Sequence, residues 1–282
     1  FAREGLDVQL VYFAAAAPIA VAVASGDVDV GATGITAALF NTIADGSRIY
    51  LVADRGSEKA GYHLNALVTT RERYEQGLRS VTDLRGRRIG ITGLGSTYHY
   101  QIGRILELNG LSLADVELVP LRNISVMLEA VREGTVDAAL VSPPWGADAE
   151  EEGWGKVVFW AGDLMPYQVT GVFYSDKLRR QRELGVRFMR AYIRGVRWYL
   201  QAAFGNDEGA RRELIELVAR HTEADPRAVA RSLSYIDPNA RVDVQDLMNQ
   251  QDWYLRQGMI RRILQPEEFV DLSFVEEALK DL

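Results

Sequence analysis

The chain has 282 residues, of which 48% are hydrophobic and 25% charged, so it is long enough for two domains with cores of ordinary size. Its net charge of −7 disfavours a nucleic-acid backbone or an anionic membrane surface as the main partner, because both would be repelled on average. It has no cysteine, and His63, His99 and His221 share no metal-ligand spacing, so the sequence predicts no disulfide, thiolate chemistry, metal site or cofactor.

Short apolar runs alternate with helical patterns through the first two-thirds of the chain. The strand candidates are residues 8–13, 28–32, 49–52, 66–70, 88–92, 116–120, 138–141, 156–160 and 171–174. Helical patterns fall between many of them, at residues 18–25, 35–44, 97–109 and 125–133. This order predicts an α/β fold with largely parallel sheets.

The first residues run directly into the strand candidate 8–13, without an initiator methionine or a leader sequence. We therefore expect the chain to begin within a fold. The missing signal segment then does not argue against export.

From about Asp176 onward the pattern becomes mainly helical. The expected helices are residues 186–203, 208–221, 226–233, 244–257 and 273–282. Asp225-Pro226 fits an N-cap followed by proline at the first helical position. We expect this tail to form a helical layer rather than a third domain with its own chemistry.

One pattern occurs twice along the chain. Residues 19–34 and 126–142 each read as a helix that ends at a glycine, followed by Val-Asp, a short apolar strand and a loop of small residues. The repeat indicates two similar α/β lobes, although a helix–glycine–strand order is also common in α/β proteins in general.

Several stretches, taken in order, resemble the substrate-binding proteins of ABC importers, of the nitrate/sulfonate/taurine and thiamine-precursor type. The resemblance spans roughly residues 1–175. It rests on residues 1–8, 24–31 and 83–90, and on residues 133–139 followed by Pro143-Pro144-Trp145. Each motif is loose, and their order makes the match specific.

The resemblance implies a type 2 periplasmic-binding fold, a two-lobed clamp joined by two crossover strands, with a helical C-terminal layer. Lobe one would be residues 1–65 plus 172–282, and lobe two residues 66–171. The crossovers would lie near residues 63–70 and 167–174. The first strand and helix of the family, which would precede Phe1, are absent from this sequence, and with them one loop that touches the ligand.

Ligands of open α/β sheets bind beyond the carboxyl ends of the strands, against helix N-termini. In lobe two, residues 93–100 follow a strand and open a helix, so Ser96 or Thr97 is expected to cap it and to contact a ligand together with Tyr98. An ordinary strand-to-helix turn with a cap is the alternative. Gly93-x-Gly95 also begins a dinucleotide pattern, but Tyr98 occupies the third glycine position.

The same rule selects further residues as ligand contacts. In lobe one the corresponding loop contains Thr33 and Gly34, and in lobe two Trp145 follows two prolines as a flat wall or, equally, as a packed side chain. The crossovers add Asn65, with His63 beside it, and Tyr167, Thr170 and Gly171. Arg122 follows a strand and is either a counter-charge for an anion or a surface residue.

These walls are aromatic and hydroxylic with few fixed charges, which favours a small organic ligand such as an aromatic acid, a sulfonate or a heterocycle. The resemblance implies a monomeric, periplasmic or lipid-anchored binding protein that delivers this ligand to the membrane permease of an ABC importer. No nucleic-acid partner is expected, and no apolar stretch of about 18 residues predicts a transmembrane helix.

Two other functions stay open. One is the ligand-sensing effector domain of a regulator, which shares the clamp fold but is shorter and joined to a helix-turn-helix. The other is an enzyme like the thiamine-pyrimidine synthases, whose cysteine-containing signature is missing here. No G-x-S-x-G elbow or paired acid is apparent, so we expect no catalytic residues.

Overall fold

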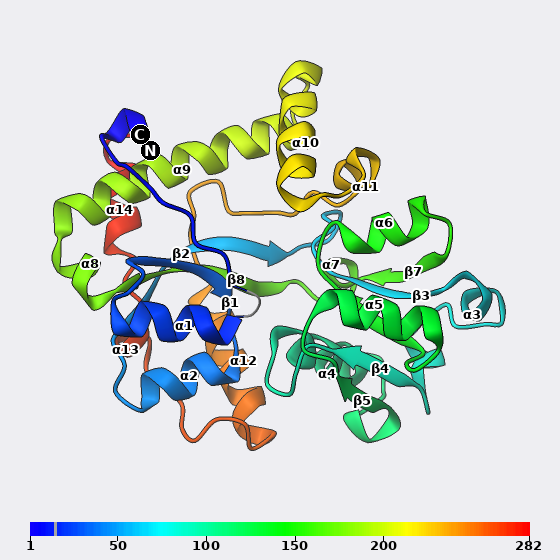
Figure 1. Cartoon of the computed structure of the whole chain (residues 1–282). Coiled ribbons are helices and arrows are strands. Elements are labelled where there is room, and N and C mark those ends of the chain that lie inside the picture. The colour runs from blue at the N-terminus through cyan, green and yellow to red at the C-terminus, as the bar shows by residue number, and fades with distance from the viewer. Residues whose placement is uncertain (14–15) are drawn as a thin grey trace. The chain divides into compact units, whose positions relative to one another are not determined.

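The computed structural model describes residues 1–13 and 16–282, which form two compact units. Unit 1 consists of Phe1–Ser57, Gln168–Asn206 and Ile236–Leu282, and unit 2 of Glu58–Tyr167 and Asp207–Tyr235. Figure 1 shows their helices and strands. The fold is the mixed α/β fold predicted from the sequence, with two sheets and a helix-rich C-terminal part.

Unit 1 is built around a three-stranded sheet in the order β1-β8-β2. The strands are β1 (Val30–Gly34), β2 (Ile49–Glu58) and β8 (Tyr167–Ser175), and β8 runs antiparallel to β1. The helices are α1 (Ala16–Ser25), α2 (Ala37–Ala44), α8 (Asp176–Arg180), α9 (Arg182–Phe204), α12 (Val244–Arg256), α13 (Pro266–Phe269) and α14 (Ser273–Leu279), with a 3-10 turn at Ala2–Glu4.

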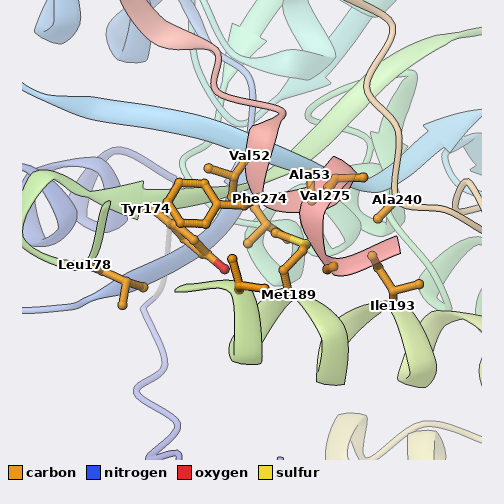
Figure 2. Close-up of a cluster of buried hydrophobic side chains, with 12 residues drawn as sticks. Val52, Ala53, Tyr174, Leu178, Met189, Ile193, Ala240, Phe274 and Val275 are labelled. Atoms are coloured by element: carbon orange, nitrogen blue, oxygen red, sulfur yellow. The ribbon is translucent and has the colours of Figure 1, made fainter. Parts of the chain in front are cut away.

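The core of unit 1 lies between this sheet and the long helix α9, against which α14 packs (Figure 1). Figure 2 shows Tyr174 of β8 and Phe274 of α14 beside Met189 of α9. The two rings meet edge to face with centroids 5.0 Å apart, and the Tyr174 hydroxyl donates to the Gly185 carbonyl at 2.7 Å. The buried tyrosine thus keeps its polar atom paired inside an apolar cluster.

Asp54, on β2, ties the three chain segments of unit 1 together. Its carboxylate accepts hydrogen bonds from the backbone of Gly56 at 2.8 Å, from the Gln168 side chain and from the backbone of Asp237 at 2.7 Å. Its own N–H donates to the Ala240 carbonyl at 2.9 Å. Burial raises the pKa of Asp54, and the donors around it oppose that rise.

We expect the change Asp54→Ala to lower the free energy of unfolding by about 2–4 kcal/mol, because it leaves several buried donors without an acceptor. Denaturant titrations of wild type, of Asp54→Ala and of a matched variant measure this loss of free energy. The matched change Asp7→Ala, at an exposed aspartate of the same unit, should alter stability by less than about 0.5 kcal/mol. Equal effects of the two changes would contradict the role given to Asp54.

Unit 2 contains a five-stranded sheet in the order β5-β4-β6-β3-β7. The strands are β3 (Ala66–Thr70), β4 (Arg88–Ile91), β5 (Glu117–Pro120), β6 (Ala138–Val141) and β7 (Gly155–Trp160). The helices are α3 (Arg71–Glu75), α4 (Thr97–Leu108), α5 (Ile124–Glu133), α6 (Trp145–Glu151), α7 (Ala161–Leu164), α10 (Glu208–Thr222) and α11 (Pro226–Arg231), with 3-10 turns at Val81–Leu84 and Leu113–Asp115.

The segment Asp207–Tyr235, which carries α10 and α11, belongs to unit 2. Arg231 forms an ion pair with Glu151 of α6 at 2.9 Å and a second one with Glu150, and Lys59 lies 3.9 Å from the centroid of the Tyr235 ring. The sequence-based prediction assigns this segment to lobe one with the rest of the tail. The predicted boundaries of lobes one and two concern the functional division of the chain, and they stay a prediction.

The pattern repeated in the sequence folds alike in both units. Helices α1 and α5 end at Ser25 and Glu133, and the glycine after each, Gly26 and Gly134, has a positive φ of 79° and 82°. A left-handed residue at this place favours glycine and turns the chain from the helix into the next strand. In both copies that strand, β1 or β6, follows within a few residues.

Two expectations about strands were wrong. Residues 8–13 form no strand: Leu10 is 71% exposed, and none of the strands described in unit 1 pairs with this apolar run. The sheets are also parallel only in part. β4 is parallel to β5 and β6, but β3 is antiparallel to β6 and β7, because it enters the sheet from β2 and not through a helical crossover.

Candidate functional site

The polar residues at the carboxyl ends of β4 and β6 are joined to each other. Ser96 caps α4, its hydroxyl accepting from the His99 N–H at 3.2 Å. Tyr98, in the first turn of α4, forms a hydrogen bond with Ser142, which follows β6. Two neighbouring parallel strands thus end at one edge of the sheet with their loops connected, as expected of a ligand-binding edge.

Burial determines the charge state of the aromatic groups at this edge. It raises the pKa of Tyr98 to about 12 and lowers the pKa of His99 to about 4, so both are neutral near pH 7. The Gly95 N–H donates to His99 Nδ1 at 3.0 Å, which leaves the ring proton on Nε2. The Tyr98 and His99 side chains at this edge are therefore uncharged, and both can form hydrogen bonds.

Beside this edge lies a buried cluster of Glu58, Asn65 and Gln101, which we call the polar triad. Glu58 Oε1 accepts from the Asn65 backbone N–H at 3.1 Å and from Gln101 Nε2 at 2.7 Å. Asn65 was predicted as a ligand contact, whereas Glu58 and Gln101 were missed. Tyr98 belongs to the same neighbourhood, because the charge of Glu58 also raises the pKa of the tyrosine.

Glu58 is an unusual acid. Burial raises the pKa of its carboxyl to about 8, with the amides of Gln101 and Asn65 opposing the rise and Asp163 adding to it. The side chain consequently holds its proton at neutral pH, in a setting where an ionised carboxylate would be poorly compensated.

The other residues of unit 2 that were predicted as ligand contacts also have structural roles within the unit. Thr97 is half-buried as the first residue of α4. Trp145 begins α6 and packs against the buried cluster of Ala66, Val68 and Val141, so at least part of its ring serves packing. Tyr167 is buried with its ring centroid 5.3 Å from that of Tyr100.

The residues predicted for unit 1 meet in one strand pair. In the β1–β8 register Thr33 lies opposite Gly171 and Gly34 opposite Thr170. Thr170 donates from its hydroxyl to the Gly56 carbonyl at 3.2 Å. A Cβ on Gly171 would lie 2.1 Å from Leu51 Cδ1, so close packing against β2 explains this glycine without a ligand.

Two residues weighed as possible contacts have other surroundings. His63 stacks on Trp160 with centroids 4.2 Å apart, and its Nδ1 lies 2.7 Å from the Arg231 carbonyl oxygen. Arg122 is exposed with a positive φ of 71°. Among residues 1–13 and 16–282, no group of three or more His, Asp or Glu side chains could hold a metal ion.

This fold is that of the periplasmic-type binding proteins. A structure of the alkanesulfonate-binding protein SsuA from Xanthomonas axonopodis pv. citri bound to MOPS aligns with a TM-score of 0.67 and 20% identity, covering 93% of this chain and 86% of that one. The periplasmic nitrate-binding protein NrtA from Synechocystis PCC 6803 aligns with a TM-score of 0.75 and 12% identity, covering 98% and 81%.

The profile of the NMT1-like family matches residues 1–219, and the chain belongs to that family. Among curated proteins, none matches it. A DszB mutant in complex with biphenyl-2-sulfinic acid also shares the fold, with a TM-score of 0.65 and 16% identity, covering 100% of this chain and 93% of that one. The resemblance to importer binding proteins predicted from the sequence is thus confirmed at the level of fold and family.

The charge state of Glu58 makes the stability of the protein depend on pH. The folded state keeps this proton up to about pH 8, whereas an unfolded chain releases it near the ordinary value of 4.5, so the free energy of unfolding falls as pH rises between the two values. We expect the change Glu58→Gln to reduce that fall by up to about 1 kcal/mol per pH unit.

Denaturant titrations at several pH values between about 5 and 8 measure the difference between variant and wild type. The matched change Glu75→Gln, at an exposed position of α3, should leave the wild-type slope in place. Parallel curves for Glu58→Gln and wild type would show that Glu58 is ionised in the folded protein.

Proposed function

We propose that the chain is an extracytoplasmic solute-binding protein that captures a small organic ligand and delivers it to the membrane permease of an ABC importer. The observation that carries the proposal is the group of neutral, hydrogen-bonding side chains formed by Tyr98, Ser142 and the polar triad, in a fold shared with sulfonate- and nitrate-binding proteins. Such an edge suits recognition by hydrogen bonds rather than by a fixed charge.

The ligand class in this proposal is an aromatic acid, a sulfonate or a heterocycle. The predicted contacts are Thr33, Gly34, Thr170 and Gly171 from unit 1, and Asn65, Ser96, Thr97, Tyr98, Trp145 and Tyr167 from unit 2. Capture would be a clamp-like closure, in which contacts from both units bias the equilibrium toward a closed form. The proposal includes a monomeric state and no nucleic-acid partner, in keeping with the net charge of −7.

Two other functions are weighed against this proposal. The DszB neighbour carries a sulfinic acid in the same fold, so the fold by itself does not decide between binding and catalysis. The chain contains no cysteine for thiolate chemistry, and burial holds Glu58 and His99 neutral near pH 7. An effector domain would share the ligand-binding edge but would act on a DNA-binding partner.

None of the helices in the described part of the chain is long and apolar enough to cross a membrane.

A thermal-shift screen with aliphatic and aromatic sulfonates, aromatic acids, heterocycles and inorganic nitrate tests this function. A true ligand at 100 times its dissociation constant should stabilise the folded state by about 2.7 kcal/mol. Small-angle scattering of the protein with that ligand should show compaction. Stabilisation by nitrate alone would contradict the organic ligand class, and consumption of the ligand would contradict a binding function.

The unit 1 contacts can be tested with the ligand that this screen identifies. The change Thr33→Val keeps the shape of the buried side chain and removes its hydroxyl, so it should weaken binding by about ten-fold if that hydroxyl pairs with the ligand. The matched change Thr42→Val removes a hydroxyl that bonds within α2 and should leave affinity unchanged. Equal affinities of wild type and Thr33→Val, measured by calorimetry, would remove Thr33 from the site.

A further inference from the structure

The chain passes between the two units four times. The boundaries lie at Ser57–Glu58, Tyr167–Gln168, Asn206–Asp207 and Tyr235–Ile236. A movement of the units relative to each other is taken up near these connections, because within each unit the chain is held by its own core. The residues on either side of each boundary therefore determine where the chain can turn.

On the side of unit 1, three of the four connections are bonded to the carboxylate of Asp54. Ser57, the last residue before the first boundary, and Gly56 beside it donate to Asp54 Oδ1 at 3.3 Å and 2.8 Å. Gln168, the first residue after the second boundary, donates to the same oxygen from Nε2. Asp237, the second residue after the boundary at 235–236, donates from its N–H to Asp54 Oδ2 at 2.7 Å. One buried side chain thus holds three connections.

Gln168 is held by further hydrogen bonds within unit 1. Its Nε2 also donates to the Thr170 carbonyl at 2.8 Å, and its Oε1 accepts from the Asp243 N–H at 3.3 Å. The backbone N–H of Gln168 donates to Asp246 at 2.8 Å, and its carbonyl accepts from Gln250 at 2.7 Å. Asp243 caps α12, which contains the other two residues. We call Asp54, Gln168 and their hydrogen-bond partners the anchor network.

On the side of unit 2 the same three connections are held as well. Glu58 accepts hydrogen bonds from two residues of that unit. The ring centroid of Tyr167 lies 5.3 Å from that of Tyr100, and the Lys59 ammonium lies 3.9 Å from the centroid of Tyr235. A held residue of one unit is therefore followed, within one or two positions, by a held residue of the other.

The fourth connection is built differently. It consists of the exposed residues Gly205 and Asn206, between the end of α9 and Asp207, which caps α10. An exposed link of this kind adapts to a movement and does not direct it. The three held connections are thus the ones that can define an axis.

We infer that the anchor network is the fixed end of the joint between the two units: Asp54 couples three connections, so the chain turns at residues 57–58, 167–168 and 235–237 together. Gln168 is the positioning residue of this joint, because it links Asp54 to the start of α12. The inference rests on the proposed clamp-like closure and specifies what guides it. The sequence predicts two crossovers, and the network joins a third connection to them.

The rival explanation is that the network only holds unit 1 together. A buried amide elsewhere in that unit would then be equivalent to Gln168. Gln251 of α12 is such a residue, because it is buried and its side chain bonds to the N–H and the carbonyl of Leu264 at 2.7 Å and 3.2 Å. The changes Gln168→Met and Gln251→Met remove comparable bonds, but only the first lies in the anchor network.

Amide hydrogen exchange of the full chain, without ligand, tests the coupling. In Gln168→Met the Asp243 N–H loses its acceptor directly, whereas the N–H groups of Gly56 and Asp237 keep theirs. We expect all three amides to exchange at least about ten-fold faster than in wild type. Gln251→Met should leave the three rates unchanged. Faster exchange at Asp243 alone would overturn the inference.

The distance between the units tests the consequence of the coupling. Because the chain has no cysteine, spin labels introduced through Ala38→Cys in unit 1 and Glu129→Cys in unit 2, both at exposed positions, report this distance selectively. We expect Gln168→Met to widen the distribution of label distances and Gln251→Met to keep the wild-type distribution. Equal distributions in all three proteins, or an equal widening in both variants, would overturn the inference.

Neither measurement uses a ligand, so both decide the inference independently of the proposed function, which fails instead if the ligand screen finds no binder. If Gln168→Met does not fold, hydrogen exchange of wild type in low denaturant decides. The amides of Gly56, Asp237 and Asp243 should then open with one common denaturant dependence, below global unfolding. Three separate dependences would overturn the inference.

Discussion

The hydrogen bonds to the Asp54 carboxylate hold unit 1 together, because they are the point at which its three chain segments meet. The strand β2 brings Asp54 from the first segment, Gln168 belongs to the second, and Asp237 and Ala240 to the third. A carboxylate offers about four acceptor sites on two oxygens, whereas an amide or a hydroxyl in its place would offer only about two on one oxygen. The segments are far apart in sequence, so their association depends on this buried acceptor as well as on the apolar core around Tyr174 (Figure 2).

The same strand carries a second buried carboxyl two alternations further on. Because side chains alternate along a strand, Glu58 lies on the same face of β2 as Asp54. Glu58 belongs to unit 2, and among the described residues its Oε2 has no hydrogen bond by distance and angle. Asp54 accepts from residues of three chain segments, whereas the donors to Glu58 belong to Gln101 and Asn65 alone. Asp54 thus joins the segments of unit 1, whereas Glu58 lies in unit 2 beside Tyr98, close to the loops that end β4 and β6.

Local sequence patterns predicted most of the elements and the local structure at some of the candidate site residues. Ser96 as a helix cap and Gly134 as a left-handed end of α5 follow from rules that involve only neighbouring residues. The strand expected at residues 8–13 failed because an apolar alternation forms a strand only beside a partner edge, which local sequence does not reveal. Glu58 and Gln101 could not be found, because their burial depends on contacts across 43 positions of sequence. One signal in the sequence pointed to the burial of Glu58: Asp54, Gly56 and Glu58 continue the every-second-residue pattern of the apolar strand that begins at Ile49.

We propose that this protein binds one small organic molecule and releases it unchanged. Native mass spectrometry of the purified chain, incubated with the candidate ligands and then sprayed from a volatile buffer, tests it most directly. We expect a one-to-one complex whose ligand is recovered at its original mass. A spectrum that contains only the bare chain with every candidate, or a ligand recovered as a different compound, would contradict it.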